Sequence, residues 1–405
     1  MPLPSPTQGS DEPVDRVISL GNDLPGIPER LLLAHARGEV LFIAGAGVSM
    51  PANLPDFRRL VIKVYERLDG AVHTIIDNHT DDSPPVNLQT LSYQQAAEVK
   101  RFIARDYDVV LGMLERRMDH LPGSSSQVRR TIVEILGEGG NKPAKIHRAL
   151  MRLADRGGVI TIATTNFDRL LQAAVPTIKG KPTTYSLGAI PRPGRNKEFS
   201  GVLHIHGALE TDSKKTSDLI VTDHDFGEFY LRRRTVPDFI YDAARLYHLV
   251  LIGYSANDPP MRYLLNAVAA DGVRFNDLKE RFTFVGLKES DPIADEDWKG
   301  RGITPISYDS ENYHVALLST LERWASLSAI NGNRNKIDSE IRRIVKKTRN
   351  SATDSDRDLF DHFFRRSNNS ERTRLASFAA KCGAAHGWLD AIISVCSEKN
   401  RGGAS

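Results

Sequence analysis

The 405-residue sequence contains only two cysteines, Cys382 and Cys396, and both lie near its C-terminal end. A disulfide framework or a thiolate zinc site upstream of them is therefore excluded. No apolar run approaches the roughly 18 residues of a membrane-spanning helix, so we expect no membrane span. Residues 1–16 are rich in proline, serine and aspartate and lack the apolar segment of a secretory signal. We expect them to be a disordered lead of a cytoplasmic protein.

Neither sign of charge dominates, because the sequence has 54 Lys and Arg residues and 51 Asp and Glu residues. This balance excludes a strongly basic nucleic-acid coat and an acidic solvating tail. Residues 331–405 are the basic exception, with 15 Lys and Arg against 9 Asp and Glu. They contain no zinc-finger pattern and no basic run interleaved with aromatics, so nucleic-acid binding stays the minor alternative.

Short β-rich runs alternate with helical patterns along most of the chain. Alternation of this kind predicts βαβ units, and hence an α/β fold with a mostly parallel sheet and helices on both faces. The expected strands are residues 40–43, 158–165, 201–209, 247–255, 281–287 and 303–308. The expected helices include 26–37, several between 57 and 155, 167–174 and 260–270.

The C-terminal residues 331–405 have a helical pattern throughout. Phe360, Phe363 and Phe364 fall together on one helix face. Such residues are more often core than interface, but a helical appendage of this size has little core of its own, so docking of this face on another protomer or on a partner protein is the alternative hypothesis.

Candidate ligand-binding residues lie near the carboxyl ends of four of the expected strands, where parallel sheets bind ligands. The end of the first strand carries Gly45-Ala46-Gly47, and the ends of the next three carry Asn166, His206 and Ser255. A glycine turn after a strand allows backbone N–H groups to approach a phosphate. The third glycine of the dinucleotide-binding pattern is replaced by Met50, so the turn alone is equally well explained as a tight connection.

Four segments, in the same order, resemble the motifs of sirtuins. Gly45-Ala46-Gly47-Val48-Ser49 with Pro55-Asp56-Phe57-Arg58 resembles GAGxS…PDFR, and the segment TTNFDRLL resembles TQNID. His206-Gly207 matches the His-Gly pair, and GYSANDPP resembles the late GTS segment. The resemblance covers roughly residues 30–310 and implies a Rossmann-type NAD-binding domain over 17–330, with a helical insertion at about 60–150.

Two departures from the motifs are substitutions, since Thr165 replaces the Gln of TQNID and Tyr254 replaces the Thr of GTS. A third is an absence: residues 208–252 contain no cysteine. Sirtuin deacylases carry a four-cysteine zinc module in this interval, so we expect no zinc ribbon and no metal here. The chain is in this respect similar to the sirtuin-like proteins of bacterial anti-phage systems, which hydrolyse NAD+.

The resemblance and the chemistry of the bond assign roles to the motif residues. Cleavage of the glycosidic bond of NAD+ passes through an oxocarbenium-like state, and nicotinamide leaves as a neutral molecule without a general acid. Asn166 would orient water or the ribose hydroxyls, and His206, with an ordinary pKa near 6.5, would take the proton. Asp168 would receive the nicotinamide carboxamide, although it could equally cap the helix that follows.

The remaining expected contacts bind the substrate. Phe57 would cover the ribose, Arg58 would hold the adjoining loop or a phosphate, and Ser49 and Ser255 would cap phosphates. Asn257 is either an adenosine-ribose contact or the start of a turn before proline. We expect His147 to be an ordinary surface or packing residue and His204 to be structural. The full expected substrate-binding set is Gly45, Ala46, Gly47, Ser49, Asp56, Phe57, Arg58, Thr165, Gly253, Ser255 and Asn257.

These features predict an NAD+ glycohydrolase that uses NAD+ as its substrate and releases nicotinamide and ADP-ribose. The resemblance implies a role in anti-phage defence by NAD+ depletion (abortive infection), as a homo-oligomer regulated by a HerA-type ATPase. A short Argonaute complex is the second choice of partner. Two alternatives remain: an NAD-dependent protein deacylase, and a catalytically silent module that binds NAD+ or ADP-ribose.

Overall fold

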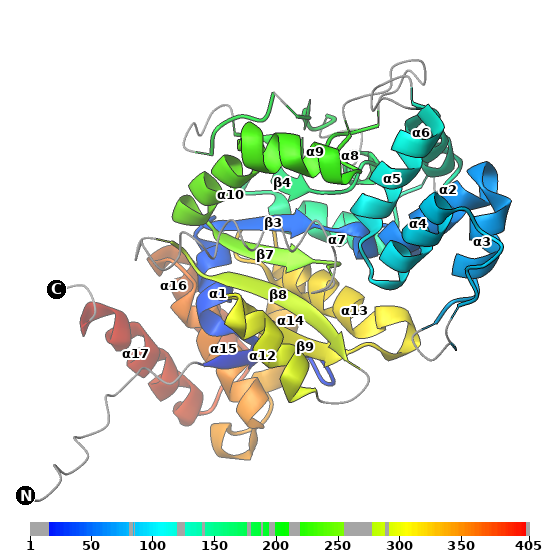
Figure 1. Ribbon diagram of the computed structural model, residues 1–405. Helices are drawn as coiled ribbons and strands as arrows, with labels where there is room; N and C mark the ends of the chain where they lie inside the picture. Colours follow the sequence, from blue (N-terminus) through cyan, green and yellow to red (C-terminus); the bar gives the residue numbers. More distant parts are fainter. Residues whose placement is uncertain are drawn as a thin grey trace, which may run out of the picture.

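A seven-stranded sheet in which all neighbouring strands are parallel forms the centre of the computed structural model (Figure 1). The structure describes residues 16–80, 84, 86–119, 126–139, 142–175, 180–187, 189–193, 199–209, 219–254, 278–287 and 291–401. The strands are β3 (Val40–Ala44), β4 (Thr161–Thr164), β5 (Thr184–Tyr185), β6 (Gly201–His204), β7 (His248–Ile252), β8 (Arg281–Leu287) and β9 (Thr304–Asp309). The predicted α/β fold with a parallel sheet is confirmed.

The strand order β5-β6-β4-β3-β7-β8-β9 places the glycine turn in the middle of the sheet. The chain leaves β3 first toward β4 and later returns on the other side of β3 as β7. This reversal of direction opens a crevice outside the carboxyl ends of β3 and β7, where ligands of such sheets bind.

Helices cover both faces of the sheet, as predicted. Along β3, Val40, Phe42 and Ala44 pack into one apolar layer, whereas Leu41 and Ile43 pack into the other. This alternation is the period of two expected of a strand buried on both sides. The first layer contains α1 (Glu29–Ala36), α7 (Lys145–Ala154), α13 (Glu311–Leu327) and the C-terminal helices. The second contains α9 (Asp223–Phe226), α10 (Thr235–Leu246) and α12 (Pro292–Gly300).

A helical module lies beside the carboxyl edge of the sheet and has an apolar core of its own. Its helices are α2 (Phe57–Leu68), α3 (Gly70–Ile76), α4 (Tyr93–Ile103), α5 (Tyr107–Asp119) and α6 (Gln127–Glu138). Arg129 of α6 joins this module to α9, because its guanidinium contacts Glu115 at 2.8 Å and Asp225 at 2.9 Å. Since α7 packs on the sheet instead, the module ends before residue 145 rather than at about 150.

The C-terminal region forms four helices, as predicted, but it is not a separate appendage. The helices α14 (Arg334–Val345), α15 (Asp354–Arg365), α16 (Asn369–Lys381) and α17 (His386–Arg401) share one apolar core with α1 and the sheet. Phe360, Phe363 and Phe364 are fully buried there, which agrees with their interpretation as core residues and contradicts the hypothesis that they dock on a partner. They pack instead against residues from the start of the chain.

A buried polar contact also ties the two ends of the described chain together. The carboxylate of Glu29 in α1 contacts His362 Nδ1 and Arg365 Nη1, each at 2.9 Å. A partner or oligomer contact by the C-terminal region therefore stays a prediction that needs another surface.

Near the N-terminus the structure corrects the predicted helix 26–37. Residues Gly26–Pro28 form a short strand, β2, that pairs antiparallel with β1 (Val17–Ser19), and the helix begins only at Glu29. Pro28 marks the boundary, because proline lacks the N–H for a helical bond and suits a helix start. Within the described part of the chain, no helix is long and apolar enough to cross a membrane. The predicted lead 1–15 and helix 260–270 lie outside the described residues.

Candidate functional site

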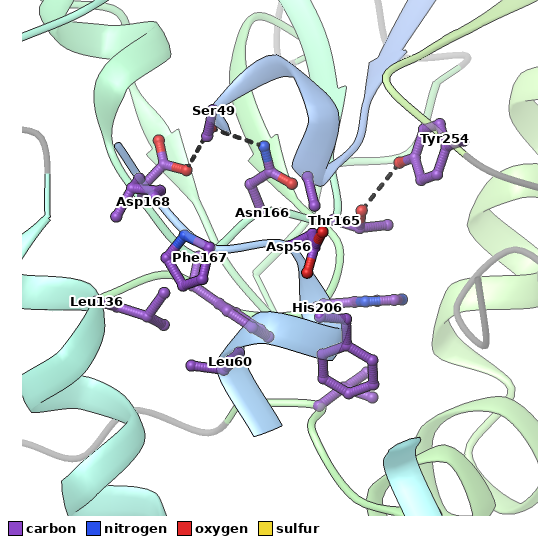
Figure 2. A pocket seen from close by; sticks show the side chains of 15 residues that line it. Ser49, Asp56, Leu60, Leu136, Thr165, Asn166, Phe167, Asp168, His206 and Tyr254 are labelled. Atoms are coloured by element: carbon purple, nitrogen blue, oxygen red, sulfur yellow. Dashed lines mark hydrogen bonds between the residues drawn. The ribbon is translucent and has the colours of Figure 1, made fainter. Parts of the chain in front are cut away.

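A small pocket of about 70 Å³ lies at the carboxyl ends of β3, β4, β6 and β7 (Figure 2). It brings together Asn166, Asp168 and His206, the three residues that the sequence predicts to be catalytic. Its lining residues are Ala46, Ser49, Leu54, Pro55, Asp56, Phe57, Leu60, Leu136, Thr165, Asn166, Phe167, Asp168, His206, Ile220 and Tyr254. Most of the other lining side chains are apolar, so polar contacts made inside this pocket are strengthened by low local polarity.

Hydrogen bonds hold Asn166 with its amide nitrogen turned away from a ligand. Its Nδ2 donates to the carbonyl oxygen of Gly45 at 2.9 Å and to Ser49 Oγ at 3.0 Å. A backbone carbonyl can only accept, so the orientation of the amide follows from this contact. Oδ1 is therefore the atom through which Asn166 would accept a hydrogen bond from a water molecule or a sugar hydroxyl.

Ser49 lies at the centre of a buried network rather than at a phosphate position. Its hydroxyl donates to Asp168 Oδ2 at 2.7 Å and accepts from Asn166, as Figure 2 shows. His147 Nδ1 accepts from the backbone N–H of Ala144, so its Nε2 carries the proton and faces Ser49 Oγ at 3.4 Å. A hydroxyl group can donate one hydrogen bond and accept two, and these three contacts use all of them. Ser49 thus has no hydrogen-bonding capacity left for the predicted phosphate contact in this arrangement.

Asp168 has one of the two roles between which the sequence left the choice open, because it caps the helix that follows, and it also lines the pocket. Its Oδ1 accepts from the backbone N–H of Leu170 at 3.0 Å, at the start of α8 (Leu170–Ala173). Its Oδ2 accepts from Ser49 inside the pocket. The carboxylate is thereby fixed in place, and its charge faces the same pocket as Asn166.

His206 differs from the base predicted from its sequence. It is 1% exposed, and burial lowers its pKa to about 3, so the ring is neutral at pH 7 and is a weak proton acceptor. Its Nε2 lies 2.6 Å from the hydroxyl of Tyr230, and Phe226 contacts its ring edge-on. Tyr230 belongs to the π-helix Gly227–Arg232, a rare element that often occurs at functional sites.

The glycine turn uses most of its backbone N–H groups inside the protein. Gly45, Gly47, Val48 and Ser49 each donate to a backbone carbonyl at 2.8–3.0 Å. At most the N–H of Ala46 can therefore donate to a phosphate in this arrangement. The predicted multi-amide phosphate cradle is not what the turn provides here.

Close packing, rather than phosphate binding, explains why these positions require glycine. A Cβ on Gly45 would lie 2.7 Å from the ring of Tyr254 and from the carbonyl oxygen of Gly253. A Cβ on Gly47 would lie 2.9 Å from the Cα of Gly253, which itself has a φ of +76°. Both distances are too short for any side chain, so the turn between β3 and α2 fits only glycine against the end of β7.

The PDFR segment builds the wall between the pocket and a larger cleft. Asp56 caps α2 by accepting from the N–H of Arg59 at 2.7 Å, and Phe57 lines both cavities. Arg58 donates to the carbonyl oxygen of His79 at 2.7 Å, so it holds the adjoining loop, which is one of its two predicted roles. Ser255 and Asn257 lie outside the described residues.

The adjoining cleft, about 1550 Å³ in volume, runs from the glycine turn toward the ends of β8 and β9. The part of its lining that the structure describes includes four cationic side chains, Arg58, Arg59, Arg105 and Lys145, and one carboxylate, that of Asp56. A cleft with this excess of positive charge attracts anionic ligands. Among the described residues, no group of three His, Cys, Asp or Glu side chains could hold a metal ion.

Residues 160–306 match the family model described as a SIR2-like domain. This part of the chain is sirtuin-like. A protein of *Sinorhizobium fredii* (strain NBRC 101917 / NGR234), the uncharacterized protein y4cA, is 33% identical over 362 residues. The alignment covers 84% of this chain but only 28% of that protein, so the chain spans little more than a quarter of its curated relative.

Two solved structures are also similar to this chain. One is described as a structural basis for the mechanism and regulation of Sir2 enzymes (13% identity, 74% of this chain and 98% of that chain, TM-score 0.33). The other is a mutant Sir2 homologue in complex with ADP-ribose (14% identity, 74% and 96% coverage, TM-score 0.28). Both TM-scores are low, and no residue correspondence follows from them.

Three residues of this site were not predicted from the sequence to act in it. His147 was expected to be an ordinary surface or packing residue, yet it lies 3.4 Å from Ser49. The spacing of His147, Leu150 and Ala154, all buried on one side of α7, is the signal that it points inward. Tyr230 lies outside the four motifs, and Tyr254 was noted only as a departure from one.

Proposed function

We propose that this chain is an NAD+ glycohydrolase that converts NAD+ and water into nicotinamide, ADP-ribose and a proton. The observation that carries the proposal is the meeting of Asn166, Asp168 and His206 in one pocket beside a cationic cleft. The cleft would hold the pyrophosphate and adenosine, and the pocket would hold the nicotinamide riboside end. The SIR2-like domain match supports NAD as the ligand class.

The protein does not need to transfer a proton before the glycosidic bond to nicotinamide breaks. The nicotinamide ring of NAD+ is cationic and leaves neutral, which produces an oxocarbenium-like ribose. Asn166 Oδ1 accepts a hydrogen bond from the attacking water, and the carboxylate of Asp168 attracts the cationic ring and its carboxamide N–H. Water forms its bond to the ribose carbon as the bond to nicotinamide breaks, and the surplus proton passes to solvent.

His206 would act in this reaction as a neutral hydrogen-bonding group. With a pKa lowered by burial to about 3, its ring is neutral at pH 7 and carries a single N–H. It can still fix a ribose hydroxyl or the water through its ring nitrogen. This role replaces the general base that was predicted from the sequence.

The surroundings of His206 argue against a protein deacylase. An acylated lysine would have to reach the ribose beside this imidazole. Tyr230 and Phe226 pack on the ring, and the N–H of Ile220 donates to the carbonyl oxygen of His206 at 2.9 Å. These contacts bury the imidazole and leave little room beside it for a peptide side chain, which supports water as the acceptor.

A silent NAD+- or ADP-ribose-binding module is the second candidate. The observation that favours it is the internal hydrogen bonding of Ser49 and His206, which leaves few free polar atoms in the pocket. Such a module would bind the ligand without releasing nicotinamide.

Incubating NAD+ with the purified protein, followed by mass spectrometry, tests the proposal. We expect nicotinamide and ADP-ribose in equal amounts without any peptide. Asn166→Ala should lower turnover by about a hundredfold or more. Asn331→Ala is the matched control, because that amide contacts the carbonyl oxygen of Asp155 at the opposite edge of the sheet. Ligand binding without product would favour the silent module, and O-acetyl-ADP-ribose formed with an acetyl-lysine peptide would favour the deacylase.

The resemblance to anti-phage proteins supports a place for this activity in bacterial defence, where NAD+ loss stops an infected cell. A homo-oligomer regulated by a HerA-type ATPase is the assembly that we propose first, and a short Argonaute complex is second. Cellular NAD+ measured during phage infection, with and without the neighbouring gene, tests this setting. A constant NAD+ level with the intact pair would contradict it.

A further inference from the structure

His204 lies two residues before the pocket residue His206 and contacts the backbone of Asn166. It is the last residue of β6, is fully buried, and does not line the pocket. Its Nδ1 lies 2.8 Å from the backbone carbonyl oxygen of Asn166. Its Nε2 lies 2.8 Å from Gln172 Nε2 of α8.

The two contacts fix the protonation of the ring. The carbonyl oxygen of Asn166 can only accept, so Nδ1 must carry the proton and donate it. Burial lowers the pKa of His204, which keeps the ring neutral, so Nε2 has no proton. Nε2 therefore accepts from the amide of Gln172, whose Nε2 also donates to Thr184 Oγ1 at 3.0 Å.

Hydrogen bonds hold the backbone of Asn166 at both its N–H and its C=O. The N–H of Asn166 donates to Thr164 Oγ1 at 3.0 Å, and its C=O accepts from His204 at 2.8 Å. The side-chain amide is held by Gly45 and Ser49. With the backbone and the amide nitrogen both fixed, only Oδ1 remains to meet a ligand.

We infer that His204 is a positioning residue that holds the backbone of Asn166 so that Oδ1 faces the water or ribose hydroxyl that it would bind. The inference rests on the proposed function for its effect on turnover, whereas the effect on the backbone of Asn166 can be measured without it. A group held within a fraction of an ångström of its productive position contributes strongly to rate, and loosening it lowers kcat rather than ligand affinity.

Two amide substitutions separate the two bonds of the imidazole. In His204→Asn, the side-chain nitrogen lies near the position of Nδ1 and keeps the donor to Asn166. In His204→Gln, the amide reaches the position of Nε2 and keeps the acceptor for Gln172 but loses that donor. Both variants bury an uncharged amide in place of the ring, so each is the control of the other for packing and stability.

Hydrogen–deuterium exchange and NAD+ kinetics provide the two readouts. We expect backbone exchange over residues 164–168 to rise at least about tenfold in His204→Gln and to stay near wild type in His204→Asn. We expect kcat for NAD+ to fall at least about tenfold in His204→Gln with KM within about twofold, and to be largely retained in His204→Asn.

Each outcome decides the inference. Unchanged exchange in His204→Gln would overturn it, whatever the activity. Raised exchange with unchanged kcat would also overturn it, because the position of Asn166 would then not limit the reaction. Equal losses in both variants would assign His204 a packing role only. If the wild type releases no nicotinamide, the proposed function fails, while the exchange data still decide whether His204 fixes Asn166.

Discussion

The hydroxyl of Thr165 lies 2.9 Å from the hydroxyl of Tyr254, so the two residues that depart from the sirtuin motifs contact each other. Thr165 follows β4 and Tyr254 follows β7, on opposite sides of β3. The phenol also donates to the carbonyl oxygen of Ala44 at 3.0 Å, at the end of β3. A smaller residue at one position thus makes room for a larger one at the other, and together they connect three strand ends.

Removing either hydroxyl should weaken ligand binding with little effect on folding. The carbonyl of Ala44 keeps the N–H of Thr165 and the Thr164 hydroxyl as donors in Tyr254→Phe, so no buried acceptor is left unpaired. Because Tyr254 lines both the pocket and the cleft, we expect Tyr254→Phe and Thr165→Val each to weaken ADP-ribose binding by about three- to tenfold.

Calorimetry on both single variants and on the double variant measures this coupling. Since the two side chains share one hydrogen bond, the double variant should bind ADP-ribose no more weakly than the weaker single variant. Fully additive losses would show that the two hydroxyls act independently.

Tyr230→Phe should lower turnover while leaving the fold intact. Tyr230 is the hydrogen-bond partner of His206 Nε2, so it fixes the orientation of the ring. Losing it should lower kcat for NAD+ by about 10–100-fold with a smaller change in KM. Tyr247→Phe is the matched control. Tyr247 is a buried tyrosine that directly precedes β7 and stacks on Phe199. Equal effects of the two substitutions would remove Tyr230 from the mechanism.

The sequence was sufficient to predict the sheet and the edge at which the site forms. The apolar run at 40–43 and its successors have the length and composition of buried strands. Because parallel strands bring their carboxyl ends to one edge, Asn166 and His206 could be expected to meet, and they line one pocket.

What the sequence could not give depends on contacts between distant segments. The pKa of His206 follows from burial under Phe226 and Tyr230, which belong to no recognisable motif. The integration of the C-terminal helices follows from contacts such as Glu29 with His362, which are 333 residues apart. Amphipathic spacing identifies an apolar helix face but not the surface that it covers.

Gly45→Ala should destabilise the protein through a clash rather than through lost flexibility. The new Cβ would lie 2.7 Å from the ring of Tyr254 and from a backbone carbonyl oxygen that cannot easily move. We expect a loss of about 1–3 kcal/mol in the free energy of unfolding, measured by urea denaturation. Gly137→Ala in α6 is the control, since no atom lies within 4 Å of its Cβ position. That change should be neutral or stabilising by up to ~1 kcal/mol. A stable Gly45→Ala protein would mean that Tyr254 does not pack on the turn.

Acid should destabilise the protein, because its buried histidines are neutral in the folded state. Burial lowers the pKa of His206 to about 3 and that of His35 to about 4, against about 6.5 in an unfolded chain. Between these values the unfolded state binds more protons, so the free energy of unfolding falls as the pH falls. The stabilisation is complete above pH 6.5, and at pH 5 each histidine costs on the order of 2 kcal/mol.

His35→Gln isolates one histidine of this acid effect. The glutamine amide can keep the contact that His35 Nε2 makes with the carbonyl oxygen of Leu153 at 2.9 Å, but it does not titrate. Urea denaturation at pH 7.5, 6 and 5 should therefore show a shallower loss of stability in His35→Gln than in the wild type. His386→Gln removes an exposed histidine and should leave the slope unchanged. Parallel slopes for His35→Gln and the wild type would show that the buried imidazole of His35 does not drive the acid response.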